Sequence, residues 1–389
     1  MQKTKPIYFD HQASTPILTE VINAMQPYWR EQHGNPHSSE HSFGWAANKA
    51  VEKARQQMGM LIGSDSDEII FTSGATEANN IALKSLCSPR VARFGRNRIL
   101  VSAIEHKCVL ESARYISKTL NYQLSVIPVD RFGKIDTAAL VELLGNDVQL
   151  VSIGFVNNEI GSIQELAEIS KLCAFHGAYL HSDCAQAPSA VDISNLSNIT
   201  DSLSFSGHKF GGPMGIGALY IQRNIAQNIE AIIHGGGQEL GIRSGTLPLP
   251  LCVGLGVASE IAGRPEAAAT RVEVANLRNR FVSIIQSARS EIQLNGDHLK
   301  NRHPGNANLH FPECDAQDVL LRLQPRIAAS SGSACTSGVT EPSHVLQSIG
   351  LTADQANSSI RFSFSPENTI TEVEHAATIL IETLTSIAG

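Results

Sequence analysis

The stretch Ser204–Gly217, SFSGHKFGGPMGIG, places one lysine between an apolar run and a glycine-rich turn. The apolar run, Ser202–Phe205, has the length of a strand in a buried sheet, and the glycines that follow indicate a turn. In open sheets of parallel strands, functional residues gather just past the carboxyl ends of the strands. The position of Lys209 therefore predicts a functional site at a strand end.

Short apolar runs alternate with helical patterns from about residue 68 to residue 222. This alternation is typical of a mostly parallel sheet covered by helices. Helices are expected over residues 43–61, 75–86 and 105–118. The seven runs expected to form strands are Glu68–Thr72, Arg98–Ser102, Leu124–Pro128, Gln149–Phe155, Ala178–Ser182, Ser202–Phe205 and Gly217–Ile221.

With 389 residues the chain is too long for a single core, so two domains are expected. The large domain is predicted to span residues 1–262, with an N-terminal segment that can pack on the small domain. Residues 263–389 are predicted to form a smaller α+β domain, with strands near 308–311 and 359–364 and a closing helix near 370–386. A long helical stretch is expected to run to about residue 290.

The composition excludes several classes of protein. A net charge of -7 and a pI near 6.1 give no electrostatic signature of nucleic-acid or acidic-lipid binding. The sequence has no run of eighteen apolar residues and no signal peptide at its start. The seven cysteines are widely spread and lack a CxxC pair, which indicates neither a disulfide framework nor a zinc site. We expect a cytoplasmic protein with no bound metal, no membrane contact and no direct nucleic-acid binding.

Polar residues follow five of the predicted strands. The turn Ser73–Glu77 opens a helix, whose free N–H groups and positive dipole end suit a phosphate group. Because the carboxyl ends of parallel strands meet at one edge, we expect all five strand ends to face one pocket. The other four sets are Glu105-His106, Asn157-Asn158-Glu159, Asp183 with Gln186, and Ser206 with His208 and Lys209.

A lysine and an aspartate at neighbouring strand ends, with a phosphate-binding helix start, form the set that pyridoxal 5'-phosphate (PLP) requires. Lys209 would form the Schiff base, and Asp183 would keep the pyridine nitrogen protonated. Each feature alone has an ordinary explanation: the turn and the aspartate as helix caps, and His106 as a core or surface side chain. Their occurrence together favours a PLP site.

Ten ordered blocks, spread over nearly the whole chain, resemble the cysteine desulfurases, in the class V aminotransferase-like branch of the fold-type I PLP enzymes. The resemblance implies that fold, a homodimer and sulfur transfer from L-cysteine. The blocks are YFDHQASTP (8–16), GNPHS (34–38), TSGATEANN (72–80), EHK (105–107), VNNEIG (156–161), HSDCAQ (181–186), SFSGHK (204–209), RSGTLP (243–248), SSGSACTSG (330–338) and SSIRFS (358–363).

The resemblance implies a role for each matched residue. Lys209 would be the Schiff-base lysine, Asp183 the partner of the ring nitrogen, and Gln186 the partner of the ring hydroxyl. His106 would stack on the ring and move protons, and Asn158 would lie near the ring oxygen and the substrate carboxylate. The residues that would hold the phosphate are Ala75, Thr76, Ser206 and His208, with Thr246 reaching the phosphate of the neighbouring subunit.

Two further residues complete the implied site. Arg361 would pair with the substrate carboxylate, for which a guanidinium group is well shaped. Cys335 lies in a long run of small and polar residues at 328–344, for which we expect mobility. Its thiolate would attack the sulfur of L-cysteine, leaving alanine and a persulfide that passes to a sulfur-acceptor protein. Cys184, beside Asp183, is assigned no role.

Two departures from the family pattern concern the acceptor. Housekeeping members commonly carry a lysine at the position of Met214, and they continue past the point where this chain ends, at Gly389. These departures favour a dedicated partner, as in tRNA thiolation or DNA phosphorothioation, over an iron–sulfur scaffold protein.

Three other readings stay open at this point. The chain could be a related lyase, such as a selenocysteine lyase, or another transferase on the same fold. It could also be a sulfur-relay subunit with a vestigial PLP site, against which the intact Lys209, Asp183, His106 and Cys335 argue. A nucleotide-binding protein is disfavoured because neither GxGxxG nor GxxxxGK[ST] occurs in the required context.

Overall fold

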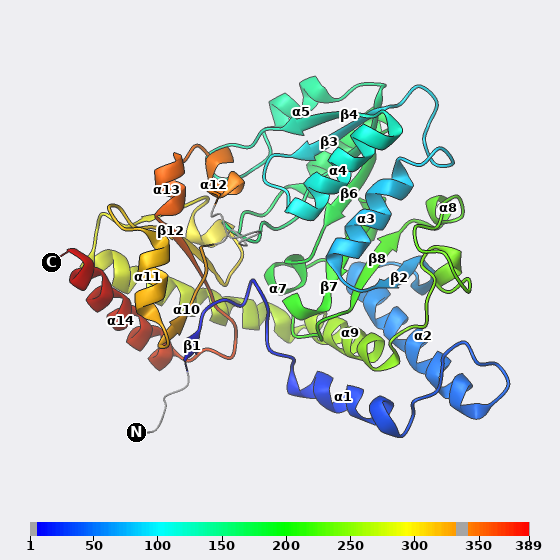
Figure 1. The fold of residues 1–389 in the computed structure, drawn as a ribbon, viewed down its shortest axis with the longest axis horizontal. Coiled ribbons are helices and arrows are strands. Elements are labelled where there is room, and N and C mark those ends of the chain that lie inside the picture. The colour runs from blue at the N-terminus through cyan, green and yellow to red at the C-terminus, as the bar shows by residue number, and fades with distance from the viewer. Residues whose placement is uncertain (1–5, 332–340, 389) are drawn as a thin grey trace.

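A seven-stranded sheet forms the centre of the larger part of the molecule (Figure 1). The computed structural model describes residues 6–331 and 341–388. The strand order is β2-β8-β7-β6-β5-β3-β4, and β8 alone runs in the opposite direction to the other six strands. The predicted fold class, a mostly parallel seven-stranded sheet covered by helices, is confirmed. The strands are β2 Ile69–Thr72, β3 Arg98–Ser102, β4 Gln123–Ile127, β5 Val148–Ser152, β6 Tyr179–Asp183, β7 Ser202–Ser206 and β8 Gly217–Ile221.

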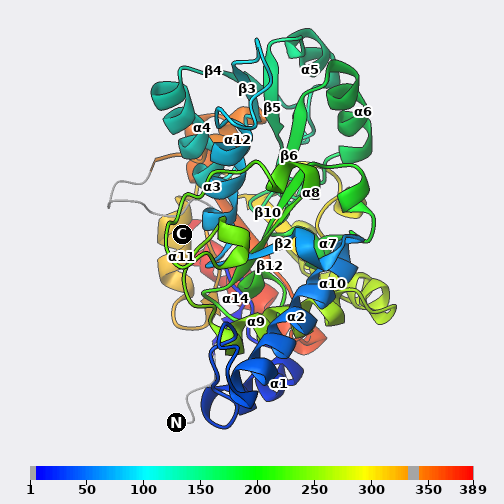
Figure 2. The same cartoon turned by 90° about the vertical axis from the view of Figure 1, so that its right-hand side faces the viewer.

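Helices cover both faces of this sheet, so its strands are buried on both sides. Successive strand residues point to opposite faces: Ile99 and Val101 pack among α3 and α4, whereas Leu100 packs in the core of α2, α6 and α9. Figure 2 shows α3 and α4 on one side of the strands and α6 and α7 on the other. The helices are α1 Thr19–Arg30, α2 Ser42–Ile62, α3 Ala75–Leu86, α4 Lys107–Leu120, α5 Thr137–Leu143, α6 Leu166–His176, α7 Ala187–Ala190, α8 Arg223–Ala226 and α9 Leu249–Ala262.

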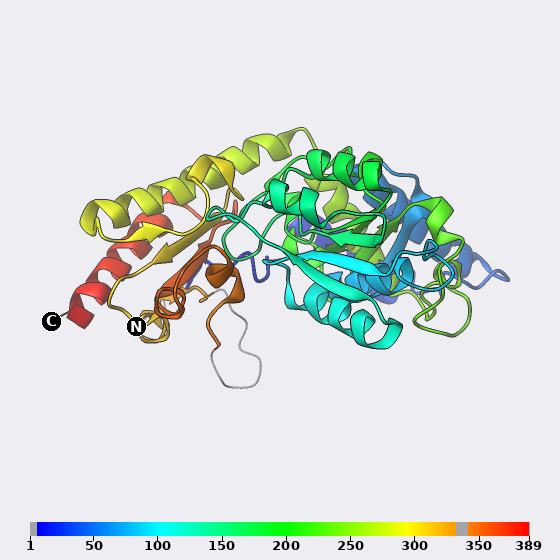
Figure 3. The ribbon, with the colours of Figure 1, turned by 90° about the horizontal axis from the view of Figure 1, so that it is seen from above.

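The C-terminal part is built on a second, antiparallel sheet of order β12-β10-β9. Figure 3 shows its helices beside that sheet, with α10 extending towards the larger part. Its elements are α10 Glu266–Ala288, β9 Gln293–Leu294, β10 Asn306–His310, α11 Ala316–Leu323, β11 Ile327–Ala328, α12 His344–Ser348, α13 Ala353–Asn357, β12 Ser359–Ser363 and α14 Ile370–Ala388. Short 3-10 helices are η1 Ser66–Glu68, η2 Leu196–Asn198, η3 Gly207–Lys209, η4 Glu239–Gly241 and η5 Leu299–Asn301.

The N-terminal segment crosses from one core to the other. Its strand β1, Ile7–Tyr8, pairs in parallel with β11, and the ring of Phe9 lies 4.5 Å from that of Phe364 and 5.6 Å from that of Phe281. The following residues then reach the large sheet, because Thr15 bonds to the His208 carbonyl through its backbone N–H. A division into domains at residue 263 stays a prediction.

The expected long helix towards residue 290 is in fact two helices, α9 and α10. The break falls at Gly263-Arg264-Pro265, where proline lacks the N–H that a continuous helix would use. None of the helices in the described residues is long and apolar enough to cross a membrane.

A buried ion pair fixes the segment that follows β8 to the sheet. The Nη1 and Nη2 atoms of Arg55 donate to the carboxylate of Glu239, at 2.8 and 2.7 Å. The same carboxylate accepts the N–H of Phe71 in β2, at 2.6 Å. Removing one partner of such a pair leaves a charge in the interior without compensation.

We therefore expect Glu239→Ala to lower the free energy of unfolding by about 3–5 kcal/mol, measured by urea denaturation. The control is Glu230→Ala, which breaks the exposed ion pair of Glu230 with Arg90 and should cost less than about 1 kcal/mol. Equal losses in the two variants would contradict this role of the buried pair.

Candidate active site

One pocket of about 480 Å³ opens at the carboxyl ends of the parallel strands. The segments after β2, β3, β5, β6 and β7 all contribute to its lining, as the sequence predicted. Because β8 runs antiparallel, its start lies at the same edge and adds Met214 and Gly215. Nine of the predicted site residues line this pocket: Ala75, Thr76, His106, Asn158, Asp183, Gln186, Ser206, His208 and Lys209.

Lys209 ends η3, one turn past β7, and its amine is largely buried. The Nζ atom donates hydrogen bonds to the carbonyl oxygens of Gln12 and Ala13, at 2.8 and 2.9 Å. Burial, together with the positive charge of Arg361, lowers the pKa of Lys209 to about 8. About a tenth of the amine is therefore neutral at pH 7, far more than for a lysine of ordinary pKa, and the neutral form is the nucleophile.

Asp183 is held by a residue to which the sequence analysis gave no role. The amide nitrogen of Asn79 in α3 donates to Asp183 Oδ2 at 2.7 Å, and the N–H of Ala185 donates to Oδ1 at 2.9 Å. The Oδ1 of Asn79 lies 2.9 Å from His181 Nε2. Burial lowers the pKa of His181 to about 4, so this imidazole is neutral. Since an amide oxygen only accepts, Nε2 carries the proton and the orientation of Asn79 is fixed.

The start of α3 forms a cradle that suits an anion. The first N–H groups of a helix have no partner within it, and the helix dipole is positive at this end. The turn is compact because Gly217 faces it: a Cβ at Gly217 would lie 2.6 Å from the Cα of Gly74. Ser206 and His208 line the pocket beside this cradle, and burial lowers the pKa of His208 to about 4.

His106 caps the helix α4. Its Nδ1 accepts the backbone N–H of Cys108 at 3.2 Å, so in the neutral ring the proton lies on Nε2. The Cys108 thiol also lines the pocket, 3.1 Å from the same Nδ1 and 3.2 Å from the Asn79 amide nitrogen. Burial raises the pKa of Cys108 to about 12, so it remains a thiol at neutral pH.

Glu105 is a buried acid in the lining of the pocket. Burial raises its pKa to about 8, and the nearby charge of Asp183 adds to this rise. Its Oε1 accepts the N–H of Gly154 at 2.6 Å. The carboxyl group is therefore mostly protonated at pH 7, which limits the negative charge next to Asp183.

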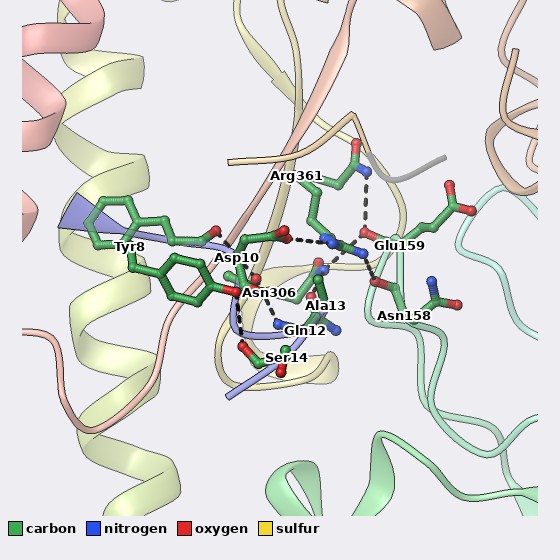
Figure 4. A network of polar contacts seen from close by, with 12 residues as sticks. Tyr8, Asp10, Gln12, Ala13, Ser14, Asn158, Glu159, Asn306 and Arg361 are labelled. Atoms are coloured by element: carbon green, nitrogen blue, oxygen red, sulfur yellow. Dashed lines mark hydrogen bonds and ion pairs between the residues drawn. The ribbon is translucent and has the colours of Figure 1, made fainter. Parts of the chain in front are cut away.

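Arg361, in β12, lies in a network beside the pocket (Figure 4). It donates to Asp10 Oδ1 at 2.6 Å and to the Asn158 carbonyl at 2.8 Å. The residue is 3% exposed and does not line the 480 Å³ pocket. Its Nε is buried, and the part of the chain that the structure describes offers it no hydrogen-bond partner.

Thr246 does not line the pocket of its own chain either, and it is exposed. Its segment is held next to the cradle by the ion pair between Arg243 Nε and Glu77 Oε1, at 2.7 Å. The contact of Thr246 with a neighbouring subunit stays a prediction.

Cys335 lies outside the described residues, but both sides of its segment can be placed. Before it, Ser330 pairs with Arg361 through two backbone hydrogen bonds, of 2.7 and 3.2 Å. After it, the Ser343 hydroxyl donates to Glu159 Oε2 at 2.5 Å, and His344 Nε2 donates to the Glu105 carbonyl at 2.9 Å. The two flanks are therefore anchored to residues at or beside the pocket.

Comparison with known proteins identifies the class. The family model for class-V aminotransferases matches residues 7–375, so the chain belongs to that family. It is 45% identical to the cysteine desulfurase IscS of Rickettsia rickettsii (strain Iowa) over 97% of this chain and 90% of the relative. We conclude that it is a cysteine desulfurase.

Two solved structures support the same assignment. A NifS-like protein superposes with a TM-score of 0.90 at 32% identity, covering 98% of this chain and all of the other. SspA in complex with cysteine superposes with a TM-score of 0.79 at 34% identity, covering 94% and 100%.

Enzymes of this family depend on PLP, and the pocket fits that cofactor. Its volume falls in the range of small-molecule sites, roughly 300–1,000 Å³. Lys209 offers an amine of lowered pKa, Asp183 a carboxylate held by Asn79, and the start of α3 an anion cradle. The residues of this chain thus provide a partner for the aldehyde, the ring nitrogen and the phosphate of PLP, and Gln186, the expected partner of the ring hydroxyl, lines the same pocket.

We expect Asn79→Ala to weaken PLP binding and to slow alanine production by about ten- to a hundredfold, because Asp183 would lose the bond that orients it. Titration of the apoenzyme with PLP, followed by absorbance, measures the first effect. The control is Asn80→Ala, which removes an exposed amide bonded to the Thr76 carbonyl. If the two variants bind PLP equally well, Asn79 does not position Asp183.

The lowered pKa of Lys209 predicts a pH dependence for the uptake of PLP by the apoenzyme. Below pH 8 the amine is mostly protonated and unreactive, so the uptake rate should rise about tenfold for each pH unit below 8 and level off above it. An amine of ordinary pKa would give a rise that continues to about pH 10. Stopped-flow absorbance measurements from pH 6 upward distinguish the two profiles.

Proposed function

We propose that this desulfurase converts L-cysteine to L-alanine and carries the released sulfur as a persulfide on Cys335. One observation supports this most strongly. A lysine of lowered pKa and an oriented aspartate share one pocket, and both flanks of the Cys335 segment are anchored beside it. A selenocysteine lyase needs no acceptor cysteine, so the placement of these flanks favours the desulfurase.

When bound, PLP supplies an electron sink that makes the α-proton of the substrate acidic. The Lys209 amine is placed to take up that proton and return it, since the carbonyls of Gln12 and Ala13 hold its Nζ at the edge of the pocket. His106 presents Nε2–H, because its Nδ1 is engaged by α4. Asp183 supplies the fixed negative charge that the ring nitrogen requires.

Arg361 is the proposed partner of the substrate carboxylate. Its Nη atoms are engaged by Asp10 and by the carbonyl of Asn158, and its Nε retains a free donor among the described residues. A carboxylate that approaches past Asn158 would meet this donor. The positive charge also remains near Lys209, where it helps to lower the pKa of the amine.

The transfer of sulfur to Cys335 needs no oxidant beyond the substrate itself. The Cys335 thiolate attacks the sulfur of the bound cysteine, so that a sulfur–sulfur bond forms and the bond from that sulfur to the β-carbon breaks. The electron pair stays on the β-carbon, which takes a proton and becomes the methyl group of alanine. An acceptor thiol then removes the outer sulfur by an exchange step.

We propose that the sulfur passes to an acceptor protein of tRNA thiolation, DNA phosphorothioation or iron–sulfur assembly, and that a dedicated partner of the first two kinds is favoured over an iron–sulfur scaffold protein. Met214 is 63% exposed at the mouth of the pocket, and it replaces the lysine of the housekeeping enzymes.

The reaction requires a reducing compartment such as the cytoplasm. In support, the six cysteines in the described residues are all free.

Lys209→Ala and Cys335→Ser should separate the two functions of the site. Lys209→Ala should lose the absorbance band of bound PLP. Cys335→Ser should keep that band but produce at least about a hundredfold less alanine, because a hydroxyl is a far weaker nucleophile towards sulfur than a thiolate.

Alanine, sulfide and the cofactor spectrum would be measured together in both variants. Cys314→Ser, which changes a half-buried cysteine, serves as the control and should retain normal turnover. Near-normal alanine production by Cys335→Ser would favour the lyase reading instead.

We also propose that the enzyme is a homodimer. Large aromatic side chains are exposed near the start of the chain: Trp29 at 63%, Phe43 at 53% and Trp45 at 60%. Exposed apolar residues in such a group indicate a protein interface. Thr246 is exposed as well, as a residue that completes a neighbouring phosphate site would be.

Sedimentation velocity should therefore show a dimer, and Trp45→Glu should shift it to a monomer with at least about tenfold lower alanine production. The matched control is Phe175→Glu, which adds a charge at a side chain that is 85% exposed on α6. A fully active monomer would contradict the proposal.

A further inference from the structure

A groove of about 1070 Å³ runs along α10, between Ala190-Val191 and the segment before β10, and shares no residue with the pocket of the active site. The floor is apolar: Val272 and Ala275 come from α10, and Leu294 and Leu299 from the segment before β10. Val272 is 60% exposed, although valine is normally buried.

The charges that line this groove are all positive. They are Arg271 and Arg278 from α10, and Lys300 and Arg302 from the segment before β10. No aspartate or glutamate is among the described residues of its lining, whereas the chain as a whole carries a net charge of -7. The groove is therefore a local positive region on an acidic protein.

Two of these cations are buried and lack a carboxylate in ion-pair contact within the described residues. Arg278 is 1% exposed and donates to the carbonyls of Leu299 and His303, at 2.6 and 3.2 Å. Arg302 is 3% exposed and donates through Nε to the carbonyl of Asp297, at 2.9 Å. Carbonyl oxygens satisfy the N–H groups but leave the net charge in place.

Two carboxylates lie near these cations, Asp297 near Arg302 and Asp192 near Arg271, but neither lines the groove. Asp297 accepts the N–H of His298 at 2.6 Å, and Asp192, which lies near Arg271, accepts the N–H of Ser194 at 2.9 Å. At the rim, Arg271 is half-buried and Lys300 is exposed. Both rim cations can reach an anion that lies in the groove.

We propose that this groove docks an acidic segment of a partner protein, with its apolar side chains on the floor and its carboxylates towards the rim cations Arg271 and Lys300, while the buried Arg278 and Arg302 add positive charge behind them. Charge complementarity supports an acidic occupant. The apolar floor, without a phenylalanine, tyrosine or tryptophan among its described residues, favours a protein segment over a nucleic acid, whose bases stack on aromatic rings. Docking here is separate from the chemistry, because none of these residues belongs to the catalytic pocket.

The test uses the cofactor-loaded, full-length enzyme and fluorescence anisotropy. The probe is a fluorescein-labelled peptide whose glutamates and leucines are spaced to lie on opposite faces of a helix. A second peptide has the same sequence with glutamines in place of the glutamates. The glutamate peptide should bind at least about tenfold more tightly, and added salt should weaken its binding.

The double variant Arg271→Glu, Lys300→Glu should lower the affinity for the glutamate peptide by at least about tenfold. Its matched control is Lys118→Glu, Lys171→Glu, which reverses two exposed lysines on α4 and α6 and should leave the affinity unchanged. Alanine production and the cofactor band should be unchanged in both, which shows that the variants are folded.

Two results would overturn the proposal. One is equal binding of the two peptides, or binding that the groove variant does not weaken. The other is that the glutamate peptide fails to bind whereas a fluorescein-labelled thymidine oligonucleotide binds, and that the groove variant abolishes the binding of the oligonucleotide. The occupant of the groove would then be a nucleic acid.

Discussion

The active site depends on keeping one lysine amine buried at the edge of a parallel sheet. Burial disfavours the ammonium form of Lys209, and the positive charge of Arg361 disfavours it further. The carbonyls of Gln12 and Ala13 satisfy the N–H groups without restoring a countercharge. The result is an amine that is reactive near neutral pH but held in one place.

The N-terminal segment makes this arrangement possible because it joins the two cores. Phe9 packs with the phenylalanines of the C-terminal core, Asp10 pairs with Arg361, and the next residues reach Lys209. About five consecutive residues thus connect the predicted substrate-binding arginine to the predicted Schiff-base lysine. Through this short connection, a displacement of one core would also move residues that contact the other core.

The sequence predicted the strands of the large sheet well, because each is a short apolar run between turns. β3 and β8 agree at both ends with Arg98–Ser102 and Gly217–Ile221. The pocket at the strand ends could be predicted for a similar reason, since parallel strands bring their carboxyl ends to one edge. The break between α9 and α10 falls at Gly263-Arg264-Pro265, where the sequence also places the predicted domain boundary, because glycine and proline interrupt a helical pattern.

The remaining features depend on contacts between distant residues, which no local pattern reveals. Asn79 bonds to Asp183 only because α3 packs across the sheet, and Asp10 pairs with Arg361 over 351 positions of sequence. The altered pKa values of Glu105 and His181 arise from burial, which the tertiary structure alone determines. The cations of the groove on α10 are likewise brought together from separate segments.

Lys209 is the residue that we propose to bind the cofactor covalently. Reduction of the PLP-loaded enzyme with borohydride, followed by digestion and mass spectrometry of the peptides, tests this most directly. We expect a pyridoxyl group on the peptide that contains Lys209, and on that lysine alone. A pyridoxyl group on another lysine, with Lys209 unmodified, would contradict it.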